Sequence, residues 1–462
     1  MDAVDLAFAG LARQAELVAA GEVGSRELVD LALARIERLD PRLNAFRVVF
    51  GERARVEADQ ADARRAAGDR RPLLGVPIAV KDDMDMAGEL TGYGSLAVRT
   101  PAAQDATIVR RLRDAGAILV GKTNVPELTL WPFTETAARG ATRNPWDLDR
   151  TPGGSSGGSG SAVAAGLVAA ATASDGLGSI RIPAACCGLF GLKPQKGRVP
   201  LDPSANDWHG LVHFGTVTRT VRDTAVFLDA VADRPSWGTF SEAAARPPGS
   251  LRIAVSMKVP PPLMAPVEAE VRDGVLALAE TLRGLGHAVV ERDPDYEAAP
   301  LVRALTRYVR GAVDGAARTD RPDALERRTK TIARIGRMVP RSVLERSRAE
   351  EAEVSARIAR LWDDVDVLLT PAITSLPLPI GRFEGRGGLW TFNGSGRFVP
   401  HLGWWNVTGQ PAASVPAGFT PDGVPLAAQL VGRPDDEATL LSLSAQLEAE
   451  TGWPARRPDL AS

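Results

Sequence analysis

The sequence predicts an α/β fold, because helices and strands alternate along it. Residues 106–124 (ATIVRRLRDAGAILVGKTN) indicate a helix, a glycine turn and a buried strand. The pattern returns with a strand at 251–257, a helix at 267–286 and a strand at 287–291. A short apolar strand that ends in a lysine lies within residues 72–83 (PLLGVPIAVKDD). Such alternation is typical of a sheet covered by helices.

The other expected elements complete the chain. Ser25 is a candidate N-cap, and the Ala-rich residues 161–173 (SAVAAGLVAAATA) are predicted to form a buried helix too short to span a bilayer. Residues 233–249 (DRPSWGTFSEAAARPPG) are the best linker candidate. Further helices are expected at 5–21, 25–40, 52–68, 320–362 (an Arg-rich, solvated cap) and 438–453, and buried strands at 364–373 and 411–419.

Composition indicates an ordinary soluble globular protein. The chain has 462 residues, of which 44% are hydrophobic and 24% charged, with a net charge of −2. A length prior of roughly 150 residues per domain allows two or three domains, or one large α/β domain. The small net charge gives no support for nucleic acid or a membrane surface as a partner. Two adjacent cysteines favour a reducing, cytoplasmic compartment, and the acidic N-terminus does not resemble a signal peptide.

No cofactor or metal motif is evident. The four histidines show no metal-binding spacing, which argues against a zinc hydrolase. The acidic residues 82–85 (DDMD) could hold Mg²⁺, but solvated loop charge is the preferred interpretation. The glycine-rich loop lacks the GK[ST] ending of a phosphate-binding loop, and residues 176–179 (GLGS) are not a dinucleotide fingerprint. We therefore expect no cofactor.

Residues 151–161 (TPGGSSGGSGS) allow two interpretations. Composition alone favours a flexible linker. The Ala-rich helix expected directly afterwards favours a shaped loop instead. The run also matches GxSxG, but the preceding TRNPWDLDRTP does not indicate the strand that a nucleophile elbow requires.

A lysine and several serines offer catalytic chemistry without histidine. A serine needs a base to become nucleophilic, and a lysine can be that base. Lys81 ends an apolar strand, where burial would lower its pKa and favour the neutral amine. The glycines of residues 175–179 (DGLGS) allow backbone N–H groups to turn toward a developing oxyanion.

Three segments occur in order and with matching spacing: GVPIAVKD, TPGGSSGGSGSAVAAG and SDGLGSIRIPAACCGLFGLKP. Together they strongly resemble the amidase signature family, serine hydrolases with a Ser-cisSer-Lys catalytic group. The resemblance also covers GKTNVPEL, WWNVTGQPAASVPAGF and QLVGRP, and is weakest between Ser236 and Asp363. It therefore runs through most of the chain.

The resemblance implies one large α/β/α domain with a mixed, mostly parallel, twisted sheet covered by helices. Residues 233–249 then become a surface connection within that domain. Its expected parts are a helical N-terminal part (1–70), a catalytic signature region (71–220), a variable substrate-side region (about 235–360), and C-terminal strands and a helix (361–462).

The resemblance also implies roles for single residues. Ser179 would be the acyl-enzyme nucleophile, and Lys81 the general base that draws its proton through Ser155, which would follow a cis peptide bond. The oxyanion hole would consist of the N–H groups of Gly176, Leu177, Gly178 and Ser179. The loop supports would be Ser156, Asp175 and Arg181.

One residue departs from the family pattern, which commonly has two glycines before the nucleophile. Leu177 replaces the first of them. A backbone donor works with any residue except proline, but a positive φ would strain a leucine by about 1–2 kcal/mol. The side chain would also narrow the acyl pocket.

Several neighbouring residues receive plainer interpretations. Cys186 and Cys187 are expected to pack as small apolar residues. His209 and His213 are expected in the core or a loop lining. For the substrate pocket, the first-choice wall residues are Trp131 and Phe133, in WPFTET just before the serine loop.

The expected function is hydrolysis of a small to medium, apolar or aryl carboxamide through an acyl-serine, with ester and carbamate (urethane) cleavage as further reactions. The expected partner is this small molecule, and the expected assembly is a monomer or homodimer. Two alternatives stay open. One is the glutamine-amidase subunit of a tRNA-dependent amidotransferase, against which residues 195–203 (QKGRVPLDP) argue because a Tyr-Gly-Arg-type stretch typically stands there. The other is a catalytically silent binding homologue, suggested only by Leu177.

Overall fold

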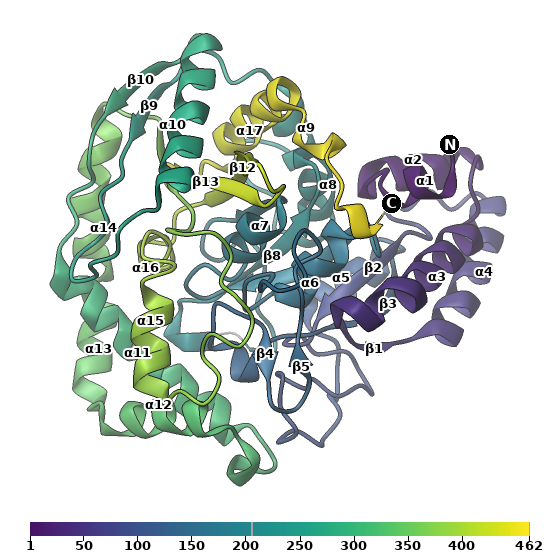
Figure 1. The fold of residues 1–462 in the computed structure, drawn as a ribbon. Coiled ribbons are helices and arrows are strands. Elements are labelled where there is room, and N and C mark those ends of the chain that lie inside the picture. The colour runs from purple at the N-terminus through teal and green to yellow at the C-terminus, as the bar shows by residue number, and fades with distance from the viewer. Residues whose placement is uncertain (205–206, 462) are drawn as a thin grey trace.

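A mixed eleven-stranded sheet is the centre of the fold in the computed structural model, which describes residues 1–204 and 207–461 (Figure 1). The strand order is β1-β3-β2-β6-β8-β7-β12-β13-β11-β9-β10. The strands are β1 (Phe46–Val49), β2 (Pro77–Lys81), β3 (Ile118–Thr123), β6 (Ala170–Asp175), β7 (Phe190–Lys193), β8 (His213–Thr218), β9 (Arg252–Val255), β10 (Ala288–Glu291), β11 (Val367–Pro371), β12 (Ala412–Phe419) and β13 (Pro425–Gly432), with a separate pair β4 (Glu135–Thr136) and β5 (Gly140–Ala141).

Helices cover this sheet. In Figure 1, α1–α4 lie on one side of the molecule, beside β1 and β3, and α10–α15 lie on the opposite side. The helices are α1 (Ala3–Ala7), α2 (Leu11–Ala20), α3 (Ser25–Leu43), α4 (Gly51–Ala66), α5 (Thr107–Asp114), α6 (Gly157–Ala164), α7 (Arg181–Cys187), α8 (Val221–Val231), α9 (Phe240–Ala245), α10 (Ala269–Gly284), α11 (Ala298–Ala317), α12 (Arg327–Met338), α13 (Arg341–Ala349), α14 (Glu351–Ala359), α15 (Gly388–Gly396), α16 (Trp404–Val407) and α17 (Glu437–Thr451).

The α/β class and the mixed, helix-covered sheet are confirmed, but parallel pairs do not predominate. Four neighbouring pairs of the large sheet are parallel. Six are antiparallel. A parallel pair needs a helical crossover, which α5 supplies between β2 and β3 and α10 between β9 and β10. In the centre of the sheet, β12 and β13 are joined by a short turn and pair antiparallel.

Both faces of the sheet are buried. Ile78 and Val80 of β2 belong to one apolar cluster, while Ala79 between them belongs to another. Successive side chains of a strand point to opposite faces, so the alternation places a core on each side. This burial explains why the apolar strands read as continuous hydrophobic runs.

The prediction of a single helix over residues 161–173 is wrong. Helix α6 ends at Ala164, and strand β6 begins at Ala170. Gly166 between them has φ 62°, and a Cβ there would lie 2.8 Å from the Phe8 ring. A uniformly apolar alanine run has no periodicity that separates a buried helix from a buried strand.

Two other stretches differ in detail from the prediction. The linker candidate 233–249 contains α9, which starts with a capping box between Thr239 and Glu242 and buries Phe240. The helical prediction for 320–362 is realised as α12, α13 and α14, with Pro340 between the first two.

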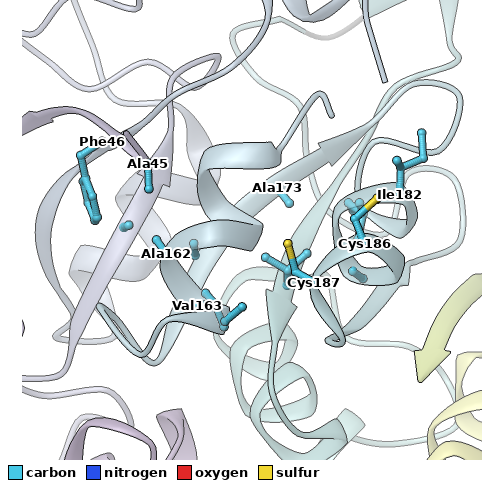
Figure 2. Packing of buried hydrophobic residues seen from close by; sticks show 14 of the residues in the cluster. Ala45, Phe46, Ala162, Val163, Ala173, Ile182, Cys186 and Cys187 are labelled. Atoms are coloured by element: carbon cyan, nitrogen blue, oxygen red, sulfur yellow. The ribbon is translucent and has the colours of Figure 1, made fainter. Parts of the chain in front are cut away.

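The cysteines pack as apolar side chains, as predicted. Cys186 and Cys187 are free thiols, fully buried on α7. Figure 2 shows Cys187 beside Ala162 and Val163 of α6, in the cluster that these two helices share. Burial raises the pKa of both thiols, which keeps them protonated and unreactive.

No helix in the described part of the chain is long and apolar enough to span a membrane. Within the same residues, no cluster of three or more His, Cys, Asp or Glu side chains is arranged to hold a metal ion.

Candidate active site

Lys81 lies at the carboxyl end of β2 with its side chain fully buried. Its Nζ is 2.9 Å from Ser155 Oγ and 2.6 Å from Ser174 Oγ. Burial lowers the pKa of Lys81 below its ordinary value, although the negative charges of Asp83 and Asp175 act in the opposite direction. A lowered pKa favours the neutral amine, the form that can accept a proton.

Ser174 and Asp83 are site residues that sequence reasoning missed. Ser174 Oγ donates to Asp83 Oδ2 (2.6 Å), and the same oxygen lies 3.1 Å from Lys81 Nζ. The interpretation of residues 82–85 as solvated loop charge is wrong, because the Asp83 side chain is only 8% exposed. The signal available in the sequence was Asp83's position two residues after the lysine.

The neighbouring Asp82 forms a second buried cluster. It lies 2.6 Å from Arg47 Nε and 3.1 Å from Lys122 Nζ, with the side chains of Asp82 and Lys122 1% and 0% exposed. Lys122 is the last residue but one of β3, the strand next to β2, and pairs with Val80 in the register. Two buried lysines therefore lie near the carboxyl ends of neighbouring strands, one register position apart, and of these two it is Lys81 that contacts Ser155 and Ser174.

The loop 151–161 is not a linker. All of its residues are buried. A Cβ on Gly154 would lie 2.5 Å from the Trp131 carbonyl oxygen, so only glycine fits there. The peptide bond between Gly154 and Ser155 is cis. Ser156 ties the loop to β6, since its Oγ donates to the Ser174 carbonyl and accepts from the Ser174 N–H, each at 3.3 Å.

The loop that carries Ser179 is held by a buried ion pair. Asp175 ends β6, Arg181 begins α7, and both side chains are 0% exposed. Burial opposes ionisation of Asp175, but the charge and hydrogen bonds of Arg181 outweigh this effect and hold its pKa well below the ordinary value. Asp175 also accepts from the N–H groups of Gly178 (2.6 Å) and Ile180 (3.2 Å). Asp175 and Arg181, two of the three predicted supports, therefore hold this loop.

The predicted oxyanion donors divide into two groups. The N–H of Gly178 is occupied by Asp175, so we remove Gly178 from the predicted set. Among the described residues, the N–H groups of Gly176, Leu177 and Ser179 have no protein acceptor. Gly178 contributes its conformation instead: its φ is 120°, and a Cβ would lie 2.5 Å from Leu402. Three donors remain available for an oxyanion.

Leu177 adopts no strained conformation. Its φ is not positive, unlike that of seven other described non-glycine residues. The backbone at this position therefore accepts a leucine, and the strain considered from the sequence does not arise. Its side chain lines a cavity together with Ser179.

Ser179 lies on two cavities of different character. The first, called the apolar cavity, has a volume of about 150 Å³ and is lined mainly by aliphatic and aromatic side chains, among them Trp131, Leu177 and Tyr308. The second, called the acidic cavity, is lined by Asp83, Asp207, Asp314 and Arg318 together with Ser155, Ser174 and Tyr93. The structure thus brings Ser155 and Ser179 to one cavity wall.

Of the two residues predicted to form the pocket wall, one lines a cavity and the other does not. Trp131 lines the apolar cavity. Phe133 lies behind it, 1% exposed, and stacks on Trp131 and on Phe383 with ring centroids 6.1 and 4.8 Å apart.

One contact of the predicted relay is absent. Across the described residues, no hydrogen bond joins the hydroxyls of Ser155 and Ser179, although both line the acidic cavity. Of the histidines, His213 is buried beside the Asp175 carbonyl (3.4 Å) and His209 pairs with Asp314 (3.0 Å). Neither histidine contacts a predicted catalytic serine.

Comparisons with known proteins find similarity over nearly the whole chain. The family model for Amidase matches residues 27–441. AmiB2 of Mycobacterium tuberculosis, which is named as a candidate amidase, is 52% identical over 462 residues, covering 100% of both chains.

Two solved structures are also similar. One is 6-aminohexanoate cyclic dimer hydrolase complexed with substrate, with a TM-score of 0.89, 32% identity and coverage of 99% of this chain and 100% of the other. The other is a bacterial aryl acylamidase of the amidase signature enzymes, with a TM-score of 0.83, 26% identity and coverage of 97% and 99%.

Proposed function

The chain belongs to the amidase family, and from this premise we propose that it hydrolyses a small to medium, apolar or aryl carboxamide through an acyl-enzyme on Ser179. The observation that carries the proposal is the Lys81 amine, buried and 2.9 Å from Ser155 Oγ, in a site whose cavity wall includes Ser179. The apolar cavity supports the choice of an apolar acyl group. Esters and carbamates also carry a carbonyl carbon that Ser179 Oγ can attack.

Proton transfer starts at Lys81. The neutral amine takes the proton of Ser155 Oγ, which in turn takes the proton of Ser179 Oγ as that oxygen attacks the carbonyl carbon. Because no hydrogen bond joins the two serines, a side-chain rotation must bring them together when substrate is bound. Asp83, 3.1 Å from Lys81 Nζ, stabilises the ammonium formed in this step.

The developing oxyanion is bound by backbone donors. The N–H groups of Gly176, Leu177 and Ser179 are the candidates, and the loss of one such donor typically costs about 2.7–4 kcal/mol in the transition state. The C–N bond of the tetrahedral intermediate then breaks. The leaving nitrogen receives the proton held on Lys81, which passes back through Ser155. Water then attacks the carbonyl of the acyl-enzyme, and its proton passes through Ser155 to Lys81. The same proton returns through Ser155 to Ser179 Oγ as the acid leaves.

The proposal is tested with a fluorophosphonate that reacts with activated serines. We expect one adduct per chain, located on Ser179 by intact mass and peptide mapping, and none in Ser179→Ala. Ser161→Ala is the control, because this serine lies in the glycine-rich stretch of Ser155 but donates to the Arg143 carbonyl. Labelling of the folded protein at another serine would contradict the proposal. So would the absence of any label together with no hydrolysis of any amide in a broad panel.

Leu177 is expected to set the size of the acyl group. Leu177→Ala removes a side chain from the wall beside Ser179 and keeps the backbone donor. Hydrolysis of amides with bulkier acyl groups should gain about tenfold in kcat/KM relative to small ones, the scale of discrimination for a methylene-sized change. The measurement is kcat/KM along a series of acyl chains with one amine.

The control for Leu177 is Leu305→Ala, which removes the same volume from the apolar cavity on α11 rather than beside the nucleophile. Its shift should be smaller. An acyl-chain profile in Leu177→Ala that matches the unmodified enzyme would refute the assignment.

A further inference from the structure

Ser179 stands where the two cavities meet. It lines both of them, as does Trp208. The Trp208 indole packs against Gly176 and Gly311, where added Cβ atoms would lie 2.7 and 2.5 Å from its ring. Tyr308 meets it edge-on, with centroids 5.0 Å apart. A substrate carbonyl at Ser179 would therefore have its two sides in different surroundings.

The acidic cavity carries more negative than positive charge. Its wall holds three carboxylates, Asp83, Asp207 and Asp314, and one guanidinium, Arg318, which lies 2.7 Å from Asp207. Asp314 pairs with His209, but burial lowers the pKa of this histidine, although Asp314 opposes the effect, so the ring is mostly neutral near pH 7. The charge of Arg318 also acts on Asp314, but that guanidinium pairs with Asp207, so among the described residues Asp314 has no Arg or Lys ion pair of its own.

Asp83 supplies a second observation. Its side chain is 8% exposed and lines the acidic cavity, yet its Oδ1 makes no hydrogen bond. Only Oδ2 is used, by Ser174 and Lys81. When Lys81 is neutral, as a base must be, the charge of Asp83 is uncompensated. A buried carboxylate oxygen without a donor is costly, and a cationic group in the cavity would relieve that cost.

From these charges we propose that the two cavities divide the substrate: the apolar cavity takes the acyl group, and the acidic cavity takes the amine leaving group, with a preference for amines that carry a second, cationic ammonium group. This inference rests on the proposed amide hydrolysis at Ser179. It names the substrate class as N-acylated diamines and related cationic amides. An aliphatic amine released here is itself protonated near neutral pH, and the same carboxylates favour that protonated form.

The test compares amides that share a phenylpropanoyl group and differ in the amine. One series uses diamines from ethylenediamine to hexamethylenediamine, and the other uses the matching amino alcohols, which are neutral at the far end. We expect kcat/KM to be about fivefold higher for the diamine at the best spacer length, since partly exposed charge pairs contribute up to about 1 kcal/mol. Product acid is quantified by chromatography.

A second comparison places the charge on the acyl side, with the anilides of aminohexanoic and hexanoic acid. There the cationic compound should be the poorer substrate, because its ammonium group would enter the apolar cavity. A cationic preference on this side instead would reverse the assignment of the cavities and overturn the proposal.

The variant that isolates the effect is Asp314→Asn on α11, whose side chain is 41% exposed and does not contact the serines or Lys81. It should lose most of the diamine preference, measured as the ratio of kcat/KM for the diamine amide to kcat/KM for the matching amino-alcohol amide. Glu280→Gln on α10, 71% exposed, removes the same charge elsewhere and should change nothing. Equal rates for the two series, with Ser179 labelled and neutral amides cleaved, refute this inference and leave the proposed function standing. No cleavage of any amide and no label refute both.

Discussion

Replacement of Lys81 by methionine is expected to lower kcat/KM for amide hydrolysis by about 10²–10⁴-fold, the usual contribution of a positioned general base. Methionine keeps an unbranched apolar stem in a site that is fully buried. It removes the amine that lies within hydrogen-bond distance of Ser155 and Ser174. Steady-state kinetics on an apolar amide, together with the rate of fluorophosphonate labelling, measure the effect.

The pH profile gives a second readout of the same group. Because burial lowers the pKa of Lys81, the neutral amine is populated at lower pH than for an ordinary lysine. We expect kcat/KM to rise with pH through the lowered pKa of this lysine and then to level off, and we expect that rising limb to be missing in Lys81→Met.

Lys122→Met is the matched control for this experiment. Lys122 is also fully buried near the end of a strand, but it contacts Asp82, the Leu90 carbonyl and Thr91. Its loss should reduce the free energy of unfolding while labelling of Ser179 in the remaining folded protein continues. Equal loss of labelling in both variants, at equal folded fraction, would mean that burial of a lysine rather than proton transfer explains the result.

The roles predicted for Lys81, Ser155 and Ser179 come from the family resemblance of three segments, each continuous in the chain. The structure brings these segments together, with Lys81 next to Ser155, and Ser155 and Ser179 on one cavity wall. Alternating helices and strands were enough for the α/β class. Strand direction could not be deduced in the same way, since it depends on which strands become neighbours. Six of the ten neighbouring pairs proved antiparallel.

The missed residues depend on contacts between segments far apart in sequence. Asp83 looks like any turn carboxylate after a strand, and only the approach of β6 places Ser174 against it. Likewise, nothing in the sequence indicates that the Gly178 N–H donates to Asp175, or that Phe133 lies behind Trp131. Sequence motifs predict which residues lie together in the site, whereas the hydrogen-bond partner of each N–H group is known only from the three-dimensional structure.

Arg181→Met is expected to reduce the free energy of unfolding by about 3–5 kcal/mol, the usual cost of removing one partner from a buried ion pair. Arg181 donates to both Asp175 oxygens and also to the Leu402 carbonyl, Gln429 and Asn406. Its removal leaves the Asp175 charge buried. Urea denaturation measures the loss, and Arg341→Met, from an exposed pair with Glu345, should cost less than about 1 kcal/mol.

The double variant Asp175→Asn/Arg181→Met separates two reasons for such a loss. If the unpaired carboxylate causes it, neutralising Asp175 should recover part of the lost stability, so the two substitutions will not be additive. Activity should not recover with it, because Asp175 also holds the Gly178 and Ile180 N–H groups that shape the loop of Ser179. Recovery of both would mean that the ion pair only compensates its own charges. Recovery of stability alone would assign Asp175 and Arg181 to positioning the nucleophile.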